Sequence, residues 1–199
     1  MLATCSVGNG YTGSMTHAST PSETIYEHVM GTQFARLAPA VQRFHRLSGL
    51  TELHGQVRTY APSSAAGRLL AKLLGTPRGT SQGPLKFVLN ASSSVESWTR
   101  YFPVNTMTSQ LRARGPRLEE HLGAARLLFD LVECRGALHM KLTAMRFLGI
   151  PCPQWLLPTI KAVETGQGSE LHFHITASLP LIGEVASYAG FLTIPGENS

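Results

Sequence analysis

Most of the chain alternates between apolar and polar residues in short runs that are separated by turn residues. Alternation at a period of two is typical of a β-strand with one buried face, and Gly- or Pro-containing turns indicate antiparallel neighbours. The predicted strands are residues 53–60, 85–90, 95–102, 106–114, 117–122, 125–134, 137–148, 159–165, 170–179 and 187–194. About eight to ten such strands form an antiparallel β-barrel or a strongly curved sheet, because closure removes the exposed edges.

Helical patterns precede most of these strands. Residues 22–30 predict a short first helix. Residues 33–47 place apolar side chains at helical spacing, although a proline in the early turns leaves a start near Ala38 open. Residues 65–74 predict a third helix, with a serine cap before it and Gly75 after it. The predicted fold class is therefore mainly β with N-terminal helices, and a barrel of this kind can enclose a cavity for one small ligand.

The sequence divides into a tail and one folded domain. Residues 1–21 are rich in Gly, Ser and Thr and lack periodicity, which predicts a flexible N-terminal tail. Met15 is an alternative start of translation at the end of this tail. Residues 22–195 are expected to form a single barrel-like ligand-binding domain, since this length suits one sizeable core.

One predicted strand, residues 95–102, carries the most informative face in the sequence. The residues that share this face at strand spacing are Glu96, Trp98, Arg100 and Phe102. If the face is internal, both charges need partners, because an unpaired buried charge is costly. Two interpretations remain open. Glu96 and Arg100 form a buried ion pair that fixes the strand register, or Arg100 binds an anionic or enolic oxygen of a ligand between aromatic walls.

Several further residues are candidates for the wall of the same cavity. They are Met107, Ser109, Glu120, Trp155 and Tyr188. Glu120 shares a face with leucines and can meet Arg100 or Arg146 if it points inward. Tyr188 can donate its hydroxyl into the cavity or anchor the strand, and Ser109 lacks the G-x-S-x-G elbow of a hydrolase. Trp155 lies in a Pro-flanked segment that is either a lid over the barrel mouth, where ligands enter, or a plug at the closed end.

Histidines do not predict a metal site. His172 and His174 form a His-x-His pair, which can ligate a metal. No third ligand is placed by spacing, and Thr and Ser share their face, which favours a solvated outer surface. His45 and His54 suit a buttress of a helix–strand junction as well as catalysis. No metal and no cofactor are expected, since the chain also lacks a G-x-G-x-x-G phosphate fingerprint.

Composition and charge narrow the classes of partner. The net charge is +5, but the basic residues are scattered singly, which argues against nucleic-acid binding. No apolar run reaches the roughly 20 residues of a membrane span, and the N-terminus has no signal-peptide pattern. The three cysteines lack metal-ligand spacing and fit reduced thiols of a cytoplasmic protein. The expected partner is a hydrophobic small molecule, and a homodimer remains open.

Several motifs, taken together, give the chain a family resemblance. They are RFHRLSG with LHGQV (43–57), ESWTRYF followed by MTSQL (96–111), LEEHLGAARLLFDL (118–131), FLGIPCPQWLLP (147–158) and LPLIGEVASYAGFL (179–192). Through them, about residues 25–195 resemble the bacterial family called domain of unknown function 4166. The resemblance implies a fold neighbourhood and a partnership with short-chain dehydrogenase-like proteins, to which members are often fused. It implies no activity.

Two functions from different classes follow from these observations. The first is a cofactor-independent enzyme that cyclises or isomerises a largely apolar, acidic or enolic substrate, by analogy with small barrels of bacterial polyketide and antibiotic biosynthesis. Its expected catalytic residues are Arg100, Glu96 and Tyr188, which can polarise a substrate oxygen. Its expected substrate-binding residues are Trp98, Phe102, Met107, Ser109, Glu120 and Trp155. The second is a non-catalytic module that binds a lipid-like ligand or works beside a short-chain dehydrogenase.

Overall fold

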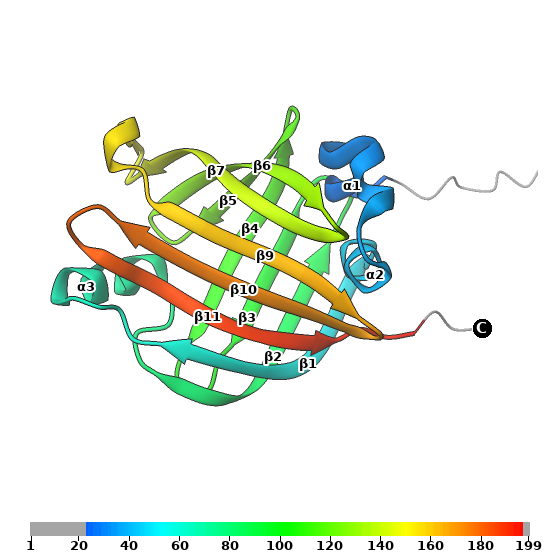
Figure 1. Cartoon of the computed structure of the whole chain (residues 1–199), viewed down its shortest axis with the longest axis horizontal. Helices are drawn as coiled ribbons and strands as arrows, with labels where there is room; N and C mark the ends of the chain where they lie inside the picture. The colour runs from blue at the N-terminus through cyan, green and yellow to red at the C-terminus, as the bar shows by residue number, and fades with distance from the viewer. Residues whose placement is uncertain (1–22, 197–199) are drawn as a thin grey trace, which may run out of the picture.

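Ten antiparallel strands form a closed β-barrel in the computed structural model, which describes residues 23–196 (Figure 1). The strands are β1 (Gly49–Tyr60), β2 (Ser81–Ala91), β3 (Glu96–Tyr101), β4 (Thr106–Arg114), β5 (Arg117–Leu122), β6 (Ala125–Cys134), β7 (Ala137–Phe147), β9 (Thr159–Gln167), β10 (Glu170–Leu179) and β11 (Gly183–Thr193). A further two-residue strand, β8 (Ile150–Pro151), pairs only with β7. The predicted antiparallel barrel is therefore confirmed.

The barrel is a meander in which neighbours in the sequence are mostly neighbours in the sheet. Strands β1 to β7 pair in order, β7 also pairs with β9, and β9 to β11 continue the series. The sheet closes where β11 pairs with β1. Closure gives every wall strand a paired neighbour on both sides, although β7 and β9 pair only where Leu138–Met140 meets Ala162–Glu164.

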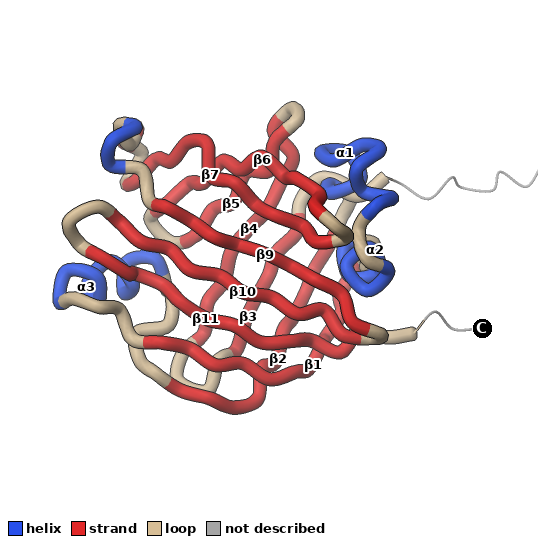
Figure 2. The backbone as a smooth tube through the Cα atoms, viewed as in Figure 1, coloured by secondary structure: helices blue, strands red, loops and turns tan. Residues whose placement is uncertain are grey.

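The helices lie at the two ends of the barrel rather than along its wall (Figure 2). One end is covered by α1 (Ile25–Met30), the 3₁₀ helix η1 (Gly31–Arg36) and α2 (Pro39–His45), and the other by α3 (Ala65–Leu74) and the 3₁₀ helix η2 (Gln154–Leu156). Thr24 caps α1 in a capping box with Glu27. Ser64 caps α3 through the Gly67 amide, and Gly75 ends it in the left-handed conformation, as predicted.

The single helix predicted over residues 33–47 is wrong. The chain forms a 3₁₀ helix as far as Arg36, is extended at Leu37 and Ala38, and becomes α-helical only at Pro39. Proline disfavours the α conformation in the residue before it, so no helix can pass through Ala38. The alternative start near this residue is correct.

Several strands begin earlier than the alternation predicts. β1 starts at Gly49, β2 at Ser81 and β11 at Gly183, each four residues before the predicted start. These extensions are made by backbone pairing, which for β1 and β2 continues from Gly49 to Thr59. Their residues are mostly small, polar or exposed, so apolar alternation does not reveal them. Residues 81–84, which precede the strand predicted over 85–90, therefore belong to β2.

Two glycines permit the close approach of β1 and β11. A Cβ atom at Gly55 would lie 1.8 Å from the carbonyl oxygen of Phe191, and one at Gly190 would lie 2.1 Å from that of Gln56. No side chain fits at such distances, and glycine in a strand interior often marks this kind of backbone contact. Both positions therefore belong to the seam that closes the barrel.

The inward side chains of the strands and the apolar faces of α1 and α2 form one core. The predicted flexible tail, residues 1–21, lies outside the described residues, as does Cys5. Within residues 23–196, no helix has the length and apolar character needed to span a membrane.

Candidate functional site

The barrel encloses a cavity of about 450 Å³. Apolar side chains form most of its wall, with Leu70 and Leu74 of α3 at the open end and Phe44 of α2 at the closed end. The polar side chains that line it are Thr76, Arg100, Glu120, Cys152, Glu164 and Tyr188. A concave, mostly apolar space with a few polar groups is the usual form of a small-molecule site.

The strand face selected from the sequence is internal. The side chains of Glu96, Trp98, Arg100 and Phe102 are only 3–8% exposed. Trp98, Arg100 and Phe102 line the cavity, whereas Glu96 does not. Met107 of β4, the register partner of Arg100, also lines it.

Arg100 places a cation in this apolar wall. Its guanidinium carbon lies 4.9 Å from the centroid of the Trp98 ring and 5.6 Å from that of Phe87. Its Nη1 donates a 3.2 Å hydrogen bond to Oγ of the buried Ser109, which does not line the cavity. Among residues 23–196, no carboxylate oxygen lies within 4.0 Å of the guanidinium. Aromatic rings and one hydroxyl thus hold a charge that has no ion-pair partner in direct contact.

The ion pair between Glu96 and Arg100, one of the two interpretations left open by the sequence, does not form. Four residues along a strand span roughly 13 Å at about 3.3 Å per residue, which is too far for contact. Oε2 of Glu96 instead accepts a 2.8 Å hydrogen bond from the indole N–H of Trp98. Burial raises the pKa of the Glu96 carboxyl, and the nearby Glu164 acts in the same direction. Glu96 therefore orients the ring against which Arg100 packs, and it does not touch the cavity.

A buried polar pair that the sequence does not predict lies at the closed end. Nε2 of His45 on α2 and Oε2 of Glu164 on β9 are 2.7 Å apart, with side chains 0% and 9% exposed. The Tyr26 ring stacks on His45 with centroids 3.6 Å apart. Burial raises the pKa of Tyr26, and its hydroxyl and His45 Nδ1 have no hydrogen-bond partner among the described residues. Of these three residues, only Glu164 also lines the cavity.

Glu164 is the functional candidate that sequence reasoning missed. It occupies an inward position two residues after the buried Ala162. In the sequence it could have been recognised only as a single acidic residue on an otherwise apolar face of a strand. Its partner is 119 residues away in the chain. His45 contacts β9 rather than the adjoining helix–strand junction that the sequence suggested. His54 is exposed and pairs with Glu52 instead.

Tyr188 and Glu120 line the cavity from two other strands, β11 and β5. Tyr188 packs edge-on against Phe102, with ring centroids 5.4 Å apart. Burial raises the pKa of Tyr188 to about 12, so its hydroxyl is protonated at neutral pH and can donate a hydrogen bond. Glu120 points inward, but among the described residues it forms no ion pair with Arg100.

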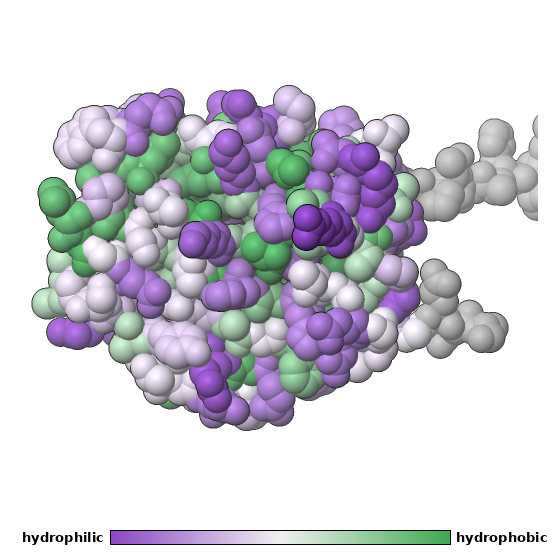
Figure 3. All heavy atoms as spheres, in the orientation of Figure 1, coloured by the Kyte–Doolittle hydropathy of each residue, from purple (hydrophilic) through white to green (hydrophobic). Residues whose placement is uncertain are grey.

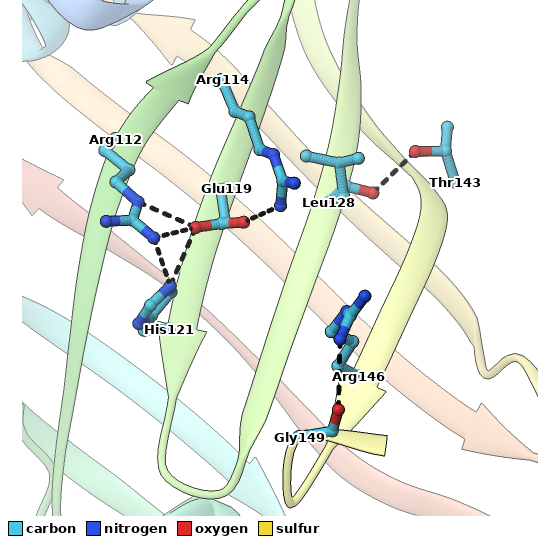
Figure 4. Close-up of polar contacts among 8 residues, drawn as sticks. All are labelled: Arg112, Arg114, Glu119, His121, Leu128, Thr143, Arg146 and Gly149. Carbon is cyan, nitrogen blue, oxygen red and sulfur yellow. Dashed lines mark hydrogen bonds and ion pairs between the residues drawn. The ribbon is translucent and has the colours of Figure 1, made fainter. Parts of the chain in front are cut away.

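The neighbouring acid, Glu119, lies on the opposite face of β5 and is fully paired (Figure 4). It accepts hydrogen bonds from Arg112 Nε (2.8 Å) and Arg114 Nη1 (2.7 Å) and lies 2.9 Å from His121 Nε2. Burial acts to raise the pKa of Glu119, but the bonds to these partners outweigh it and lower the pKa to about 2. Arg146 does not meet Glu120, because it alternates with the lining residues Met145 and Phe147 and so faces away from the cavity. Its Nη1 donates to the carbonyl oxygen of Gly149.

Trp155 lies at the mouth of the barrel but does not line the cavity. Its side chain is 73% exposed, whereas its neighbours Pro153 and Leu156 are lining residues. It is therefore not a plug at the closed end, and it does not cover the cavity in the manner of a lid.

The histidine pair on β10 lies on the outside of the barrel wall, opposite the cavity-lining residues of the same strand. His172 Nε2 lies 2.9 Å from Oε2 of Glu170, and His174 is exposed. Within the described part of the chain, no three His, Cys, Asp or Glu side chains are arranged to hold a metal ion.

Comparison with known proteins identifies a family but does not identify a function. No curated protein matches the chain. Among solved structures, the crystal structure of Rv2717c from M. tuberculosis is similar, with a TM-score of 0.42 and 13% sequence identity, covering 80% of this chain and 99% of that chain. The model of the family described as "Domain of unknown function (DUF4166)" matches residues 37–192. The resemblance carried by the motifs is thereby confirmed, and the chain belongs to the DUF4166 family.

Proposed function

We propose that the protein binds a largely apolar small molecule inside the barrel and that Arg100 binds a carboxylate, enol or carbonyl oxygen of this ligand. The observation that carries the proposal is the buried guanidinium, which lines an apolar cavity with no carboxylate of the described residues in contact. A buried charge without a partner is costly. An anionic ligand oxygen would supply that partner through charge-assisted hydrogen bonds.

The surroundings of Arg100 favour a ligand contact rather than a purely structural role. The guanidinium lies beside the Trp98 and Phe87 rings and donates one hydrogen bond, to the Ser109 hydroxyl. Its other nitrogens form no hydrogen bond with the described residues, although arginine carries five N–H donors. The free donors are therefore available to a molecule in the cavity.

The volume and lining of the cavity indicate the rest of the ligand. About 450 Å³ lies within the usual range for sites that hold one small organic molecule. Leu, Met, Phe and Ile side chains form most of the wall, so the ligand gains free energy by leaving water in proportion to its apolar area. A chain or ring system with a single acidic or enolic end fits these properties.

A binding experiment with two matched probes tests the proposal. Dodecanoate and dodecanol have the same alkyl chain and differ in the charge of the head group. We expect calorimetry to show tighter binding of dodecanoate, and Arg100→Met to weaken it roughly 10- to 100-fold, the worth of a hydrogen bond to a charged group. Dodecanol binding should hardly change, and Arg112→Met, on the outer face, should affect neither probe. If Arg100→Met lowers the affinity for both probes equally, the arginine supports the fold only.

Cofactor-independent isomerisation or cyclisation is a second candidate, because Arg100, Tyr188 and two carboxylates line the same cavity. Glu120 or Glu164 would remove a proton from the carbon next to a carbonyl group. The C–H electron pair would move toward the carbonyl oxygen, where Arg100 and the Tyr188 hydroxyl stabilise the developing enolate. The same carboxyl group would return the proton at another carbon, which balances the step without a cofactor.

Deuterium incorporation separates catalysis from binding alone. A long-chain ketone incubated with the protein in D2O should exchange its α-protons faster than in buffer. Glu164→Gln and Glu120→Gln, made separately, should identify the base, and Tyr188→Phe should slow exchange about 100-fold or more, as for the loss of one oxyanion donor. If exchange with the unmodified chain equals that in buffer while dodecanoate still binds, the protein is a binding module.

A further inference from the structure

Exposed apolar side chains gather around the mouth of the barrel. The six rim residues, which are 44–102% exposed, are Leu69, Leu73, Leu148, Ile150, Trp155 and Leu181. They belong to α3, the β7–β8 turn, β8, η2 and the β10–β11 turn. In Figure 3 this end lies on the left, where apolar side chains gather at the β10–β11 turn. Isolated exposed apolar residues are common, but a contiguous group marks an interaction surface.

Backbone contacts join these segments into one continuous rim. The Ala124 amide donates to the Leu73 carbonyl oxygen (3.3 Å), and the Leu148 amide donates to the Ala124 carbonyl oxygen (2.9 Å), which connects α3 to the β7–β8 turn. On the other side of α3, Ser64 Oγ donates to the Ile182 carbonyl oxygen (2.9 Å) in the β10–β11 turn. Next to this turn, the end of β10 pairs with the start of β9, which follows η2 in the chain. The rim therefore encircles the mouth.

Two of the rim leucines hold an unfavourable backbone conformation. Leu148 has a φ of 51° and Leu181 a φ of 65°, in the left-handed region that favours glycine or asparagine. Neither side chain contributes to the core, since both are exposed. Folding stability alone would not select a leucine at these turns. An outward leucine in a strained turn supports a role in binding.

The charged residues of the same end are almost all basic. Segments 61–80, 102–105, 123–126, 146–161 and 179–184 contain one acid, Glu184, and several exposed basic residues. These basic residues are Arg68, Lys72, Arg78, Arg126, Arg146 and Lys161. Apolar side chains that include a tryptophan, flanked by Lys and Arg, are typical of surfaces that lie on anionic bilayers.

The rim is also continuous with the cavity. Ile150 belongs to both, and four lining residues, Leu70, Leu74, Leu156 and Ile182, directly follow exposed rim residues in the sequence. An apolar molecule that leaves the cavity at this end therefore meets apolar side chains before it meets water.

We propose that the mouth of the barrel docks on the surface of an anionic phospholipid bilayer, so that an apolar ligand passes between bilayer and cavity without crossing water. The rim leucines, Ile150 and Trp155 would enter the interfacial region, while the basic side chains face the lipid phosphate groups. This docking goes beyond the proposed ligand site, because it does not require Arg100. A second copy of the chain and a partner protein are the competing occupants of the rim.

Vesicle co-sedimentation of the full chain tests the proposal. Vesicles of phosphatidylcholine alone are compared with vesicles that also contain phosphatidylglycerol. We expect at least about tenfold more binding to the anionic vesicles, and a loss of binding as added salt screens the charges. The two tryptophans give a second measurement, since Trp98 is buried and Trp155 exposed. Insertion of the rim should shift the emission of Trp155 toward shorter wavelength.

Matched variants identify the surface that binds. Trp155→Ser combined with Leu181→Ser should reduce vesicle binding about tenfold or more. The control Leu50→Ser, an equally exposed leucine at the start of β1 near the closed end, should have no effect. Arg68→Glu with Lys72→Glu should remove the preference for anionic vesicles. Arg135→Glu, in the β6–β7 turn of the closed end, should not.

Three results would overturn the proposal. The first is equal binding to neutral and anionic vesicles, or an equal loss in the Leu50→Ser control. The second is a lipid-free dimer that the rim variant dissociates, with no vesicle binding, which identifies the rim as a self-interface. The third is a monomer that binds no vesicles, which leaves a protein partner. Arg100→Met should bind vesicles like the unmodified chain, so a failed ligand experiment and a failed vesicle experiment remain distinguishable.

Discussion

At one end of the barrel, α1 and α2 pack Tyr26, Phe44 and His45 into the core, whereas at the other end α3 leaves Leu69 and Leu73 exposed to solvent. Both ends belong to the same set of strands. The closed end buries aromatic rings and a polar pair, and the open end exposes apolar side chains beside basic ones. The two ends therefore have different roles. The buried contacts of the closed end stabilise the fold, while the exposed apolar surface of the open end is available for binding.

The comparison leads us to expect the largest loss of stability from the closed end. His45→Leu removes one partner of a buried pair and leaves the Glu164 carboxylate without its hydrogen bond. We expect the free energy of unfolding, measured by urea denaturation, to fall by about 3–5 kcal/mol. His54→Leu, at an exposed histidine, is the control and should change it little. The double variant His45→Leu/Glu164→Leu should recover part of the loss, and a double variant as unstable as the single one would contradict this account.

Glu119, whose strand contacts α1 near the closed end, should give a smaller loss that depends on pH. Its pKa is about 2 in the folded chain, against an ordinary value of 4.5. The stabilisation is therefore present above about pH 4.5 and is lost as the pH falls toward 2. We expect Glu119→Gln to lower the free energy of unfolding by roughly 2–3 kcal/mol at pH 7, reduced by the exposure of its arginine partners.

Urea denaturation of Glu119→Gln and the unmodified chain across the acid range measures this effect. The two curves of unfolding free energy against pH should converge near pH 2. Glu52→Gln, in an exposed ion pair with Lys86, is the control and should leave the shape of the curve unchanged. Parallel curves for Glu119→Gln and the unmodified chain would show that ionisation of the Glu119 carboxyl does not stabilise the folded state.

Between the two ends, Arg100 should behave as a residue that serves binding rather than stability. Arg100→Met replaces a buried cation without an ion pair by an apolar side chain of similar length. We expect the free energy of unfolding to stay constant or to rise by about 1 kcal/mol, while affinity for an acidic ligand falls. Thermal and urea denaturation measure the stability of this variant, and calorimetry measures its affinity for the ligand. A large destabilisation would assign Arg100 to the core.

The smallest effect on stability should come from the open end. Trp155→Ser/Leu181→Ser removes two exposed side chains, so the free energy of unfolding should change by at most about 0.5 kcal/mol. The same variant is expected to show the largest loss of vesicle binding. If urea denaturation shows that it unfolds much more readily, the rim contributes to the core and the contrast between the ends is wrong.

Local patterns were sufficient for much of this fold. The helix from Ala65 to Leu74 follows from its serine cap and terminal glycine, and the strands from Thr106 to Cys134 follow from alternation and tight turns. The inward position of Trp98, Arg100 and Phe102 also follows from the period of two, because successive side chains of a strand point to opposite faces. These features depend on residues that are close in the sequence.

The arrangement of the site depended on contacts that no local pattern contains. His45 and Glu164 meet across 119 residues, and β1 meets β11 only because the sheet closes. Glu96 pairs with Trp98 rather than Arg100, since spacing along a strand limits which charges can touch. By itself, then, the sequence determined the strands, the turns and which side chains face inward, because these follow from short-range backbone geometry. Only the tertiary structure decided which charge is left unpaired in the cavity and which end of the barrel is open, because both depend on how distant strands and helices pack.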